Sequence, residues 1–154
     1  MTVIVERVSA LTTAELVPDQ VRDRLSAFIR RDHPEFSPEF AGRLVVESAK
    51  FQAASAARPE VRMAPSLLVD YGWHAWLMNT VEREALMERI GGVVHHVPEL
   101  PGEDRGDVKA IRRATLDAMR VSGYGPDLEF WPAASADCTQ CHAGCTDSPN
   151  SGKS

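Results

Sequence analysis

The sequence predicts an all-α protein, a compact bundle of about five helices with a short extended segment and an irregular, Cys-rich C-terminal tail. Two observations support this fold class. Apolar residues recur at spacings of three and four in several windows, which is the period of an amphipathic helix. Capping residues, prolines and glycines bound these windows where helices start and stop. We expect residues 2–8, which are rich in Val and Ile, to form either a short strand or the lead-in to a helix.

The first two helices are expected over residues 18–31 and 38–57. The apolar stripe of the first helix consists of Val21, Leu25, Phe28 and Ile29. Pro34 ends that helix, because the residue before a proline avoids the helical conformation. Ser37 is expected to cap the second helix, with Pro38 at its first position. One face of the second helix carries Phe40, Leu44, Glu47 and Phe51.

Three further helices are expected in the second half of the chain. The third runs over residues 67–79 after the capping residue Ser66 and is apolar on most sides, so we expect it to be buried in the middle of the fold. The fourth covers residues 81–90 and ends at Gly91 and Gly92. A short extended piece follows at residues 93–98. The fifth helix covers residues 107–121 and ends before Gly123.

Length and composition predict one soluble domain. The chain has 154 residues, 44% hydrophobic and 25% charged, with a net charge of −5. No run of basic residues is longer than two arginines, so we expect no nucleic-acid partner. We also expect no membrane association, because no apolar stretch approaches the roughly 20 residues that span a bilayer. The first residues lack the features of a signal peptide, which favours a cytoplasmic location with reduced thiols.

We divide the chain into a helical domain at residues 1–132, a metal-binding tail at residues 133–146 that folds back on the domain, and a disordered end at residues 147–154. Phe130 and Trp131 are expected to anchor the end of the domain in a non-helical run. From residue 133 onward, small and polar residues dominate, so this part offers little apolar surface to a core.

The tail contains four ligand-type side chains within eight residues: Cys138, Cys141, His142 and Cys145. Two thiolates separated by two residues can bind one ion, and Gly144 would let the third cysteine join them. Other interpretations are a c-type haem attachment motif, a redox-active cysteine pair, an iron–sulfur cluster with a fourth ligand, and incidental cysteines. Haem attachment normally occurs outside the cytoplasm. Redox pairs usually begin a helix after a strand.

A second group of ligand-type residues lies in the middle of the chain. Asp70 and His74 are four residues apart in the third helix, so both share one face. They are expected either to bind a metal together, with Asp70 as base or as the residue that orients His74, or only to satisfy each other by hydrogen bonding. His95 and His96 should point in opposite directions along an extended chain, so at most one should face His74.

The aromatic neighbours of this group, Tyr71, Trp73 and Trp76, are expected to line a substrate pocket beside the metal. His33 precedes a proline in a charged linker and is expected to be an ordinary surface residue.

These segments resemble a known family. Residues 69–76 read Val-Asp-Tyr-Gly-Trp-His-Ala-Trp, and residues 91–98 read Gly-Gly-Val-Val-His-His-Val-Pro, with Thr80 between them. They resemble the core of the glycine-rich domain-containing-protein-like family, whose pattern includes Val-Asp-x-x-Trp-His and Gly-x-x-x-His-His-x-Pro. The likeness covers residues 60–100, and residues 123–145 resemble the end of its short actinobacterial members. It implies a helical domain and no particular reaction, and the glycine-rich tract of the plant members has no counterpart here.

The economical hypothesis joins the two groups around one transition-metal ion, with zinc as the first choice and iron or copper as alternatives. The metal ligands would come from His74, His95, His96, Cys138, Cys141, His142 and Cys145. The chain would then be a small metalloenzyme acting on a small molecule or peptide. A structural or sensory zinc protein that binds a protein partner is the second hypothesis, and a helical interaction module without metal is the third.

Overall fold

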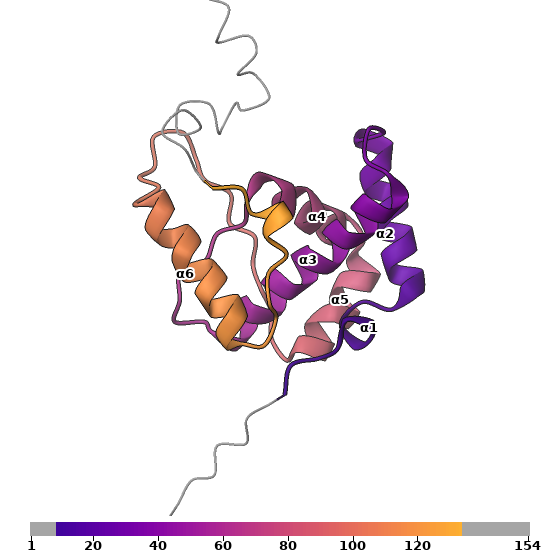
Figure 1. The fold of residues 1–154 in the computed structure, drawn as a ribbon, viewed down its shortest axis with the longest axis horizontal. Coiled ribbons are helices and arrows are strands. Elements are labelled where there is room, and N and C mark those ends of the chain that lie inside the picture. The colour runs from indigo at the N-terminus through magenta and orange to yellow at the C-terminus, as the bar shows by residue number, and fades with distance from the viewer. Residues whose placement is uncertain (1–8, 134–154) are drawn as a thin grey trace, which may run out of the picture.

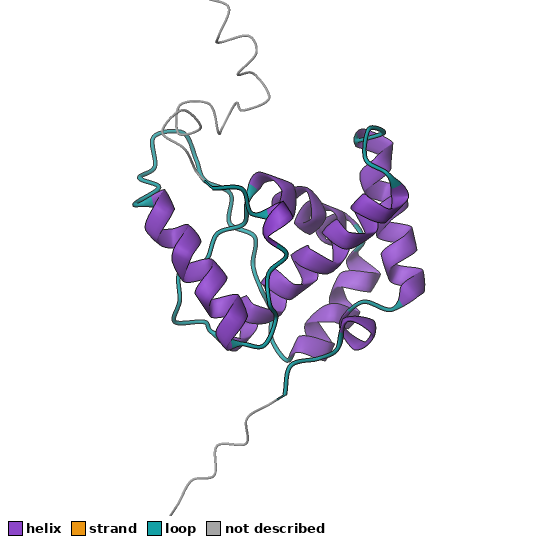
Figure 2. Cartoon of the chain, in the orientation of Figure 1, coloured by secondary structure: helices purple, strands orange, loops and turns teal. Residues whose placement is uncertain are grey.

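The computed structural model describes residues 9–133, and within that range the chain forms six α-helices and one short 3-10 helix (Figures 1 and 2). No strand occurs among these residues, so the predicted all-α class is confirmed. The predictions for residues 2–8 and for the tail from residue 134 lie outside the described residues. No helix in the described part is long and apolar enough to cross a membrane.

α1 (Thr13–Leu16) is a short helix that the sequence reasoning missed. It has four residues, too few to display a helical period. Its start is nonetheless encoded locally, because Thr12 and Glu15 form a reciprocal capping box. Leu16 is buried in the core, so the short helix anchors the N-terminal segment of the described chain.

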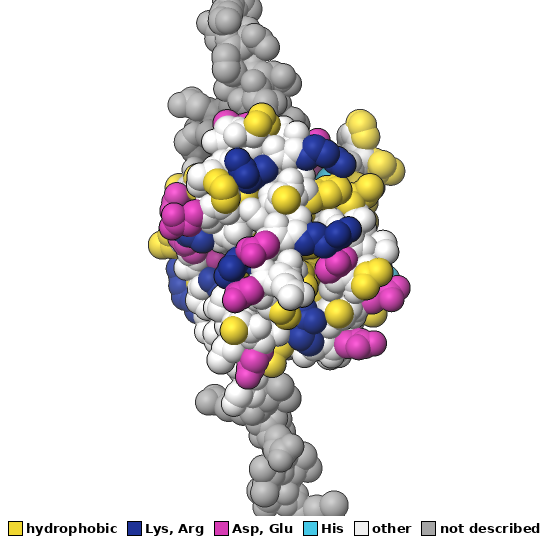
Figure 3. All heavy atoms as spheres, turned by 90° about the vertical axis from the view of Figure 1, so that its right-hand side faces the viewer, with side chains coloured by type: hydrophobic (Ala, Val, Ile, Leu, Met, Phe, Trp, Pro, Cys, Tyr) yellow, Lys and Arg dark blue, Asp and Glu magenta, His cyan; other side chains and the backbone are white. Residues whose placement is uncertain are grey.

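α3 (Pro38–Ala57) is the central helix and contacts α1, α2, α4, α5 and α6 (Figure 1). The predicted cap is confirmed, since Ser37 Oγ accepts a hydrogen bond of 3.0 Å from the Phe40 amide. α2 (Asp19–Asp32) packs against it along the stripe predicted from the sequence. The side of the molecule that carries α2 bears interspersed acidic and basic side chains with no continuous basic patch (Figure 3).

α4 (Leu67–Met78) and α5 (Thr80–Ile90) follow one another with only Asn79 between them. α4 packs against α2, α3 and α5, so the expectation that it lies in the middle of the fold holds for one of its faces, whereas Leu67, His74 and Met78 are exposed. Its buried face approaches α3 closely at Gly72, where an added Cβ would lie 2.8 Å from the Leu44 carbonyl oxygen. α4 therefore has one face in the core and one face open to solvent.

α6 (Val108–Val121) and the 3-10 helix η1 (Leu128–Phe130) complete the described part. Asp107 caps α6, and Gly123 follows it with a φ of 83°, a conformation that suits glycine. Phe130 and Trp131 are both buried, as expected for an apolar anchor. Between α5 and α6, residues 91–107 form neither helix nor strand, and this loop crosses to α4.

Candidate metal centre

Three ligand-type side chains from two separate segments meet on the solvent-facing side of α4. Asp70 and His74 come from successive turns of the helix, and His96 comes from the loop after α5. One candidate ligand atom from each residue lies within 4.8 Å of the others. We refer to Asp70, His74 and His96 as the Asp–His–His cluster. Among the described residues, these three form the one group of His, Cys, Asp or Glu side chains close enough together to hold a metal ion.

Asp70 lies between the two imidazoles. Its Oδ1 atom is 2.9 Å from His96 Nε2, and its Oδ2 atom is 3.4 Å from His74 Nε2. The two imidazole rings meet edge to face, with centroids 4.9 Å apart and planes inclined by 74°. The carboxylate therefore faces one nitrogen of each ring, and its closer partner is His96, whereas the sequence predicted His74.

The Asp–His–His cluster lies at the surface, not in a sealed cavity. The side chain of His74 is 58% exposed, that of Asp70 is 29% exposed and that of His96 is 17% exposed. His74 is thus the most exposed member of the cluster and His96, on the loop, the least exposed. A water molecule or a small ligand therefore has access to the group from the side of His74.

His95 does not join the cluster. Exposure alternates along the loop, because Val93, His95 and Val97 are exposed while Val94 is buried and His96 is half-buried. This alternation is the behaviour expected of an extended chain, and it selects His96 from the predicted pair.

Two features of the loop backbone, a turn and a hydrogen bond, determine the position from which His96 reaches α4. Gly91 ends α5 with a φ of 76° and turns the chain, which is a conformation that glycine adopts without strain. Arg83 then donates a hydrogen bond of 2.8 Å to the carbonyl oxygen of Val94, while the side chain of Val94 is buried. The residues that place His96 thus lie in α5 and in the loop itself.

The three aromatic residues predicted to line a pocket occupy different environments. Trp76 is fully buried, and its Nε1 donates to the Val45 carbonyl oxygen and to Ser48 Oγ, so it belongs to the core and not to the surface of the cluster. Trp73 is 6% exposed and its indole packs against the His96 ring at a centroid distance of 4.6 Å.

Tyr71 lies on the flank of α4 next to the cluster, where its ring packs against His33 with centroids 4.3 Å apart and planes inclined by 32°. His33 also stacks on Phe36, so it is a half-buried member of an aromatic group and not the surface residue that the sequence suggested. Burial, together with the negative charges of Glu35 and Asp70, raises the pKa of the Tyr71 phenol. The phenol is therefore close enough to the cluster to sense its charge.

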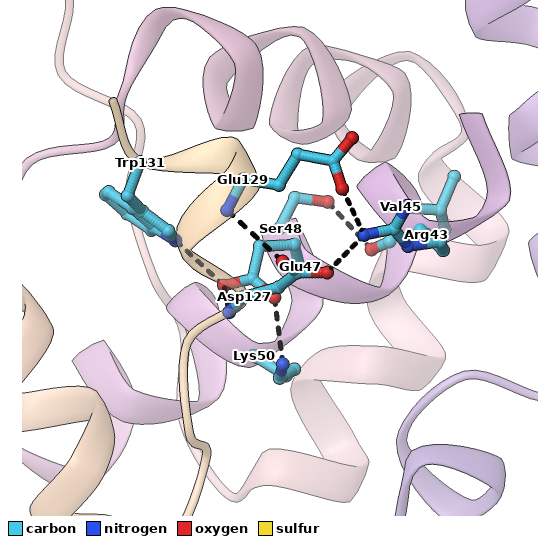
Figure 4. A network of polar contacts seen from close by, with 8 residues as sticks. All are labelled: Arg43, Val45, Glu47, Ser48, Lys50, Asp127, Glu129 and Trp131. Atoms are coloured by element: carbon cyan, nitrogen blue, oxygen red, sulfur yellow. Dashed lines mark hydrogen bonds and ion pairs between the residues drawn. The ribbon is translucent and has the colours of Figure 1, made fainter. Parts of the chain in front are cut away.

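A second polar group, which the sequence reasoning did not identify, lies on α3 (Figure 4). Glu47 is 1% exposed. Its Oε1 accepts hydrogen bonds from the Asp127 amide at 3.0 Å and from Trp131 Nε1 at 2.8 Å, and its Oε2 pairs with Lys50 Nζ at 2.8 Å. The only hint in the sequence was a carboxylate on a mostly apolar helix face.

Arg43 extends this second group by pairing with Asp127 and Glu129, both at 2.6 Å. The hydrogen bond from Arg43 holds the pKa of the Asp127 carboxyl below its usual value. Each charged member has an opposite charge beside it, so the group is saturated by its own contacts. It fastens the segment around η1 to α3.

A surface hollow of about 510 Å³ lies beside this second group, between α2 and α3. Its cationic side chains are already paired, Arg22 with Asp19 at 3.1 Å, Arg43 with Asp127 and Lys50 with Glu47. None of its lining residues belongs to the Asp–His–His cluster. The hollow is therefore a separate feature of the surface.

The predicted ligands Cys138, Cys141, His142 and Cys145 lie outside the described residues. Their convergence on the body of the protein stays a prediction. Comparison of the chain with protein-family models, with curated proteins and with solved structures finds no match. The family resemblance therefore also stays a prediction, and the geometry of the cluster is the basis for functional inference.

Proposed function

We propose that the protein binds one transition-metal ion at the Asp–His–His cluster and acts as a small metalloenzyme. The observation that carries the proposal is the convergence of a carboxylate and two imidazoles, drawn from α4 and from a loop more than twenty residues away, within 4.8 Å. Two imidazoles and one carboxylate form the ligand set of catalytic zinc sites and of non-haem Fe(II) sites. Zinc is our first choice, and iron or copper are alternatives.

The spacing of the donor atoms supports this proposal. Zinc binds imidazole nitrogen and carboxylate oxygen at about 2.0–2.1 Å, so adjacent donors lie about 2.9 Å apart at right angles and about 3.4 Å apart at a tetrahedral angle. Asp70 is 2.9 Å from His96 and 3.4 Å from His74. The two distances end on different carboxylate oxygens, Oδ1 toward His96 and Oδ2 toward His74, so a carboxylate that binds through both oxygens would match them.

The exposure of the cluster favours catalysis over a purely structural role. Three protein ligands leave at least one coordination position for water or substrate, and the side chain of His74 is 58% exposed. A bound metal would act there as a Lewis acid or would lower the pKa of a coordinated water. The substrate would be a small molecule or a peptide that reaches the surface of α4.

The cysteines of the tail remain part of the proposal as additional ligands. Trp131, near the end of the described chain, is linked to His96 by three ring contacts through Phe51 and Trp73, with centroid distances of 6.0, 5.1 and 4.6 Å. Cys138 follows Trp131 by seven residues, which can span up to about 25 Å. The tail is thus long enough to bring Cys138 or Cys141 to the ion, and a thiolate there would close the site as in structural zinc centres.

Metal content tests the centre directly, and the chain offers a matched control in His95. Protein prepared without an affinity tag should contain one equivalent of metal. His74→Ala and His96→Ala should each lose most of it, while His95→Ala should retain it, because the His95 side chain is exposed and does not belong to the cluster. Absence of stoichiometric metal in the native protein, or equal loss in all three variants, would contradict the proposal.

X-ray absorption on the metal-loaded protein decides whether the tail takes part. A first coordination shell of nitrogen and oxygen alone would mean that Asp70, His74 and His96 bind the metal without the cysteines of the tail. A sulfur contribution that disappears in Cys141→Ser would instead indicate the closed, mixed site. We expect Cys141→Ser and His74→Ala to lower metal content to a similar degree if the site is joined.

A further inference from the structure

Trp73 lies between the core and the Asp–His–His cluster. It precedes His74 in α4, but its side chain turns inward and is 6% exposed. Its indole contacts Phe51 of α3 at a centroid distance of 5.1 Å with planes inclined by 62°, and the His96 ring at 4.6 Å with planes inclined by 64°. Both contacts have the edge-to-face geometry that aromatic rings prefer. One rigid indole therefore joins the core to the loop that supplies His96.

The loop itself gives the His96 ring little other support. Residues 91–98 form neither helix nor strand, so no backbone ladder fixes the side chain. Asp70 holds one ring nitrogen at 2.9 Å, which leaves the ring free to turn about that contact. The His74 ring meets the His96 ring edge to face at 4.9 Å but is itself 58% exposed, whereas the buried indole of Trp73 packs against the His96 ring at 4.6 Å and restricts that rotation. A metal ligand needs such support, because its lone pair has to point at the ion.

We propose that Trp73 is a positioning residue for the metal ligand His96. Its indole sets the plane of the imidazole so that Nε2 faces Asp70 and His74. This inference rests on the proposed metal centre and adds a residue that does not touch the metal. It replaces the sequence-based expectation that Trp73 lines a substrate pocket, since the side chain is covered by Phe51 and His96.

Cobalt(II) tests this role, because its visible absorption reports the geometry of the ligands as well as binding. Trp73→Leu fills part of the volume without an aromatic ring and should weaken cobalt binding about 10-fold to 100-fold, the usual effect of losing a group that orients a ligand. It should also change the shape of the absorption band. Trp73→Phe keeps an aromatic ring against His96 and should restore both the affinity and the band shape.

Trp76→Phe is the matched control, because Trp76 lies in the same helix but is buried in the core and bonded to Val45 and Ser48. It should lower thermal stability and leave cobalt affinity and spectrum unchanged. Far-ultraviolet circular dichroism verifies that each variant keeps its helices. In proton NMR without metal, the His96 ring protons should be displaced by the indole ring current in the wild type and in Trp76→Phe, and should return toward ordinary positions in Trp73→Leu.

The possible outcomes separate this inference from the proposed function. Cobalt binding by Trp73→Leu with wild-type affinity and spectrum would overturn the role of Trp73 while leaving the metal centre intact. No cobalt binding by the wild type would overturn the metal centre and this inference with it. Weaker binding and an altered spectrum in Trp73→Leu, with rescue by Trp73→Phe and no change in Trp76→Phe, would establish Trp73 as a positioning residue.

Discussion

His96 Nε2 lies 2.9 Å from Asp70 Oδ1, although the two residues are 26 positions apart in the chain. The contact ties the loop after α5 to the exposed face of α4. It also creates the arrangement on which the proposed function rests, because the same carboxylate faces His74 through its other oxygen. Gly72, Glu47 and Tyr71 carry further testable expectations: Gly72 and Tyr71 lie in α4 near this contact, and Glu47 of α3 holds the segment around η1.

Gly72 should be required for the close packing of α4 on α3. In Gly72→Ala, the new Cβ would lie 2.8 Å from both the Leu44 carbonyl oxygen and Ser48 Oγ, and overpacking of this kind lowers the free energy of unfolding by about 1–3 kcal/mol. Urea denaturation measures the change. Because α4 carries Asp70 and His74, metal affinity should fall as well.

Gly42→Ala is the control for this substitution, since Gly42 also lies within a helix of the core. Its nearest neighbour would be Arg22 Cδ at 3.4 Å, at the end of a flexible side chain. Alanine should therefore be neutral or stabilising by up to about 1 kcal/mol, the difference in helix propensity. Equal destabilisation by both substitutions would mean that the α3–α4 contact is not the cause.

Glu47 should stabilise the attachment of the C-terminal segment to α3. Glu47→Ala removes the acceptor of Trp131 Nε1 and of the Asp127 amide and leaves Lys50 without its partner. Loss of a buried charged acceptor lowers the free energy of unfolding by about 3 kcal/mol. Glu47→Gln keeps a carbonyl oxygen and should cost less.

Urea unfolding followed by tryptophan fluorescence measures the effect of Glu47 on global stability, since all three tryptophans, Trp73, Trp76 and Trp131, are buried. Glu84 is an exposed glutamate of α5, and Glu84→Ala should change stability by no more than about 0.5 kcal/mol. A Glu47→Ala variant as stable as Glu84→Ala would show that the hydrogen bonds of Glu47 contribute little.

Tyr71 should make stability dependent on pH in the alkaline range. Its pKa in the folded protein is raised by burial and by the negative charges of Glu35 and Asp70. As pH rises past about 10, the unfolded chain loses this proton while the folded chain retains it, so stability falls until the folded pKa is reached. The contribution is fully present below the unfolded pKa.

Ultraviolet absorbance of tyrosinate follows this titration, and the chain has two tyrosines, Tyr71 and Tyr124. Tyr71→Phe should remove the late step in the absorbance titration. Asp70→Asn should move that step to lower pH without abolishing the shift, because burial and Glu35 remain. A late step that is unaffected by Asp70→Asn would show that the phenol does not sense the carboxylate.

Much of the secondary structure could be predicted because its determinants are local. Ser37, Ser66 and Asp107 each accept a hydrogen bond from the first turn of the helix that follows, and glycine at position 91 adopts a positive φ. These interactions join residues three or four apart, so the pattern of residues reveals them directly. α1 escaped prediction because a single turn carries no period.

The candidate site was predicted only in part. The spacing of Asp70 and His74 determined that they share a face of one helix. The sequence could not show that this face is solvent-exposed, that Trp76 points into the core, or that Tyr71 stacks on His33 instead. Those facts depend on which side of α4 packs against α3, and a helix that is apolar on most sides does not specify that side.

The sequence by itself determined the five longer helices, most of their ends and the shared face of Asp70 and His74, because each of these depends on neighbours within one or two turns. Only the tertiary structure decided that His96, and not His95, meets that pair, and that the Trp73 indole packs against the His96 ring. The physical reason is that two adjacent histidines in an extended loop have the same chemistry and point to opposite sides, so the burial of Val94 and the turn at Gly91 decide which of them faces the protein.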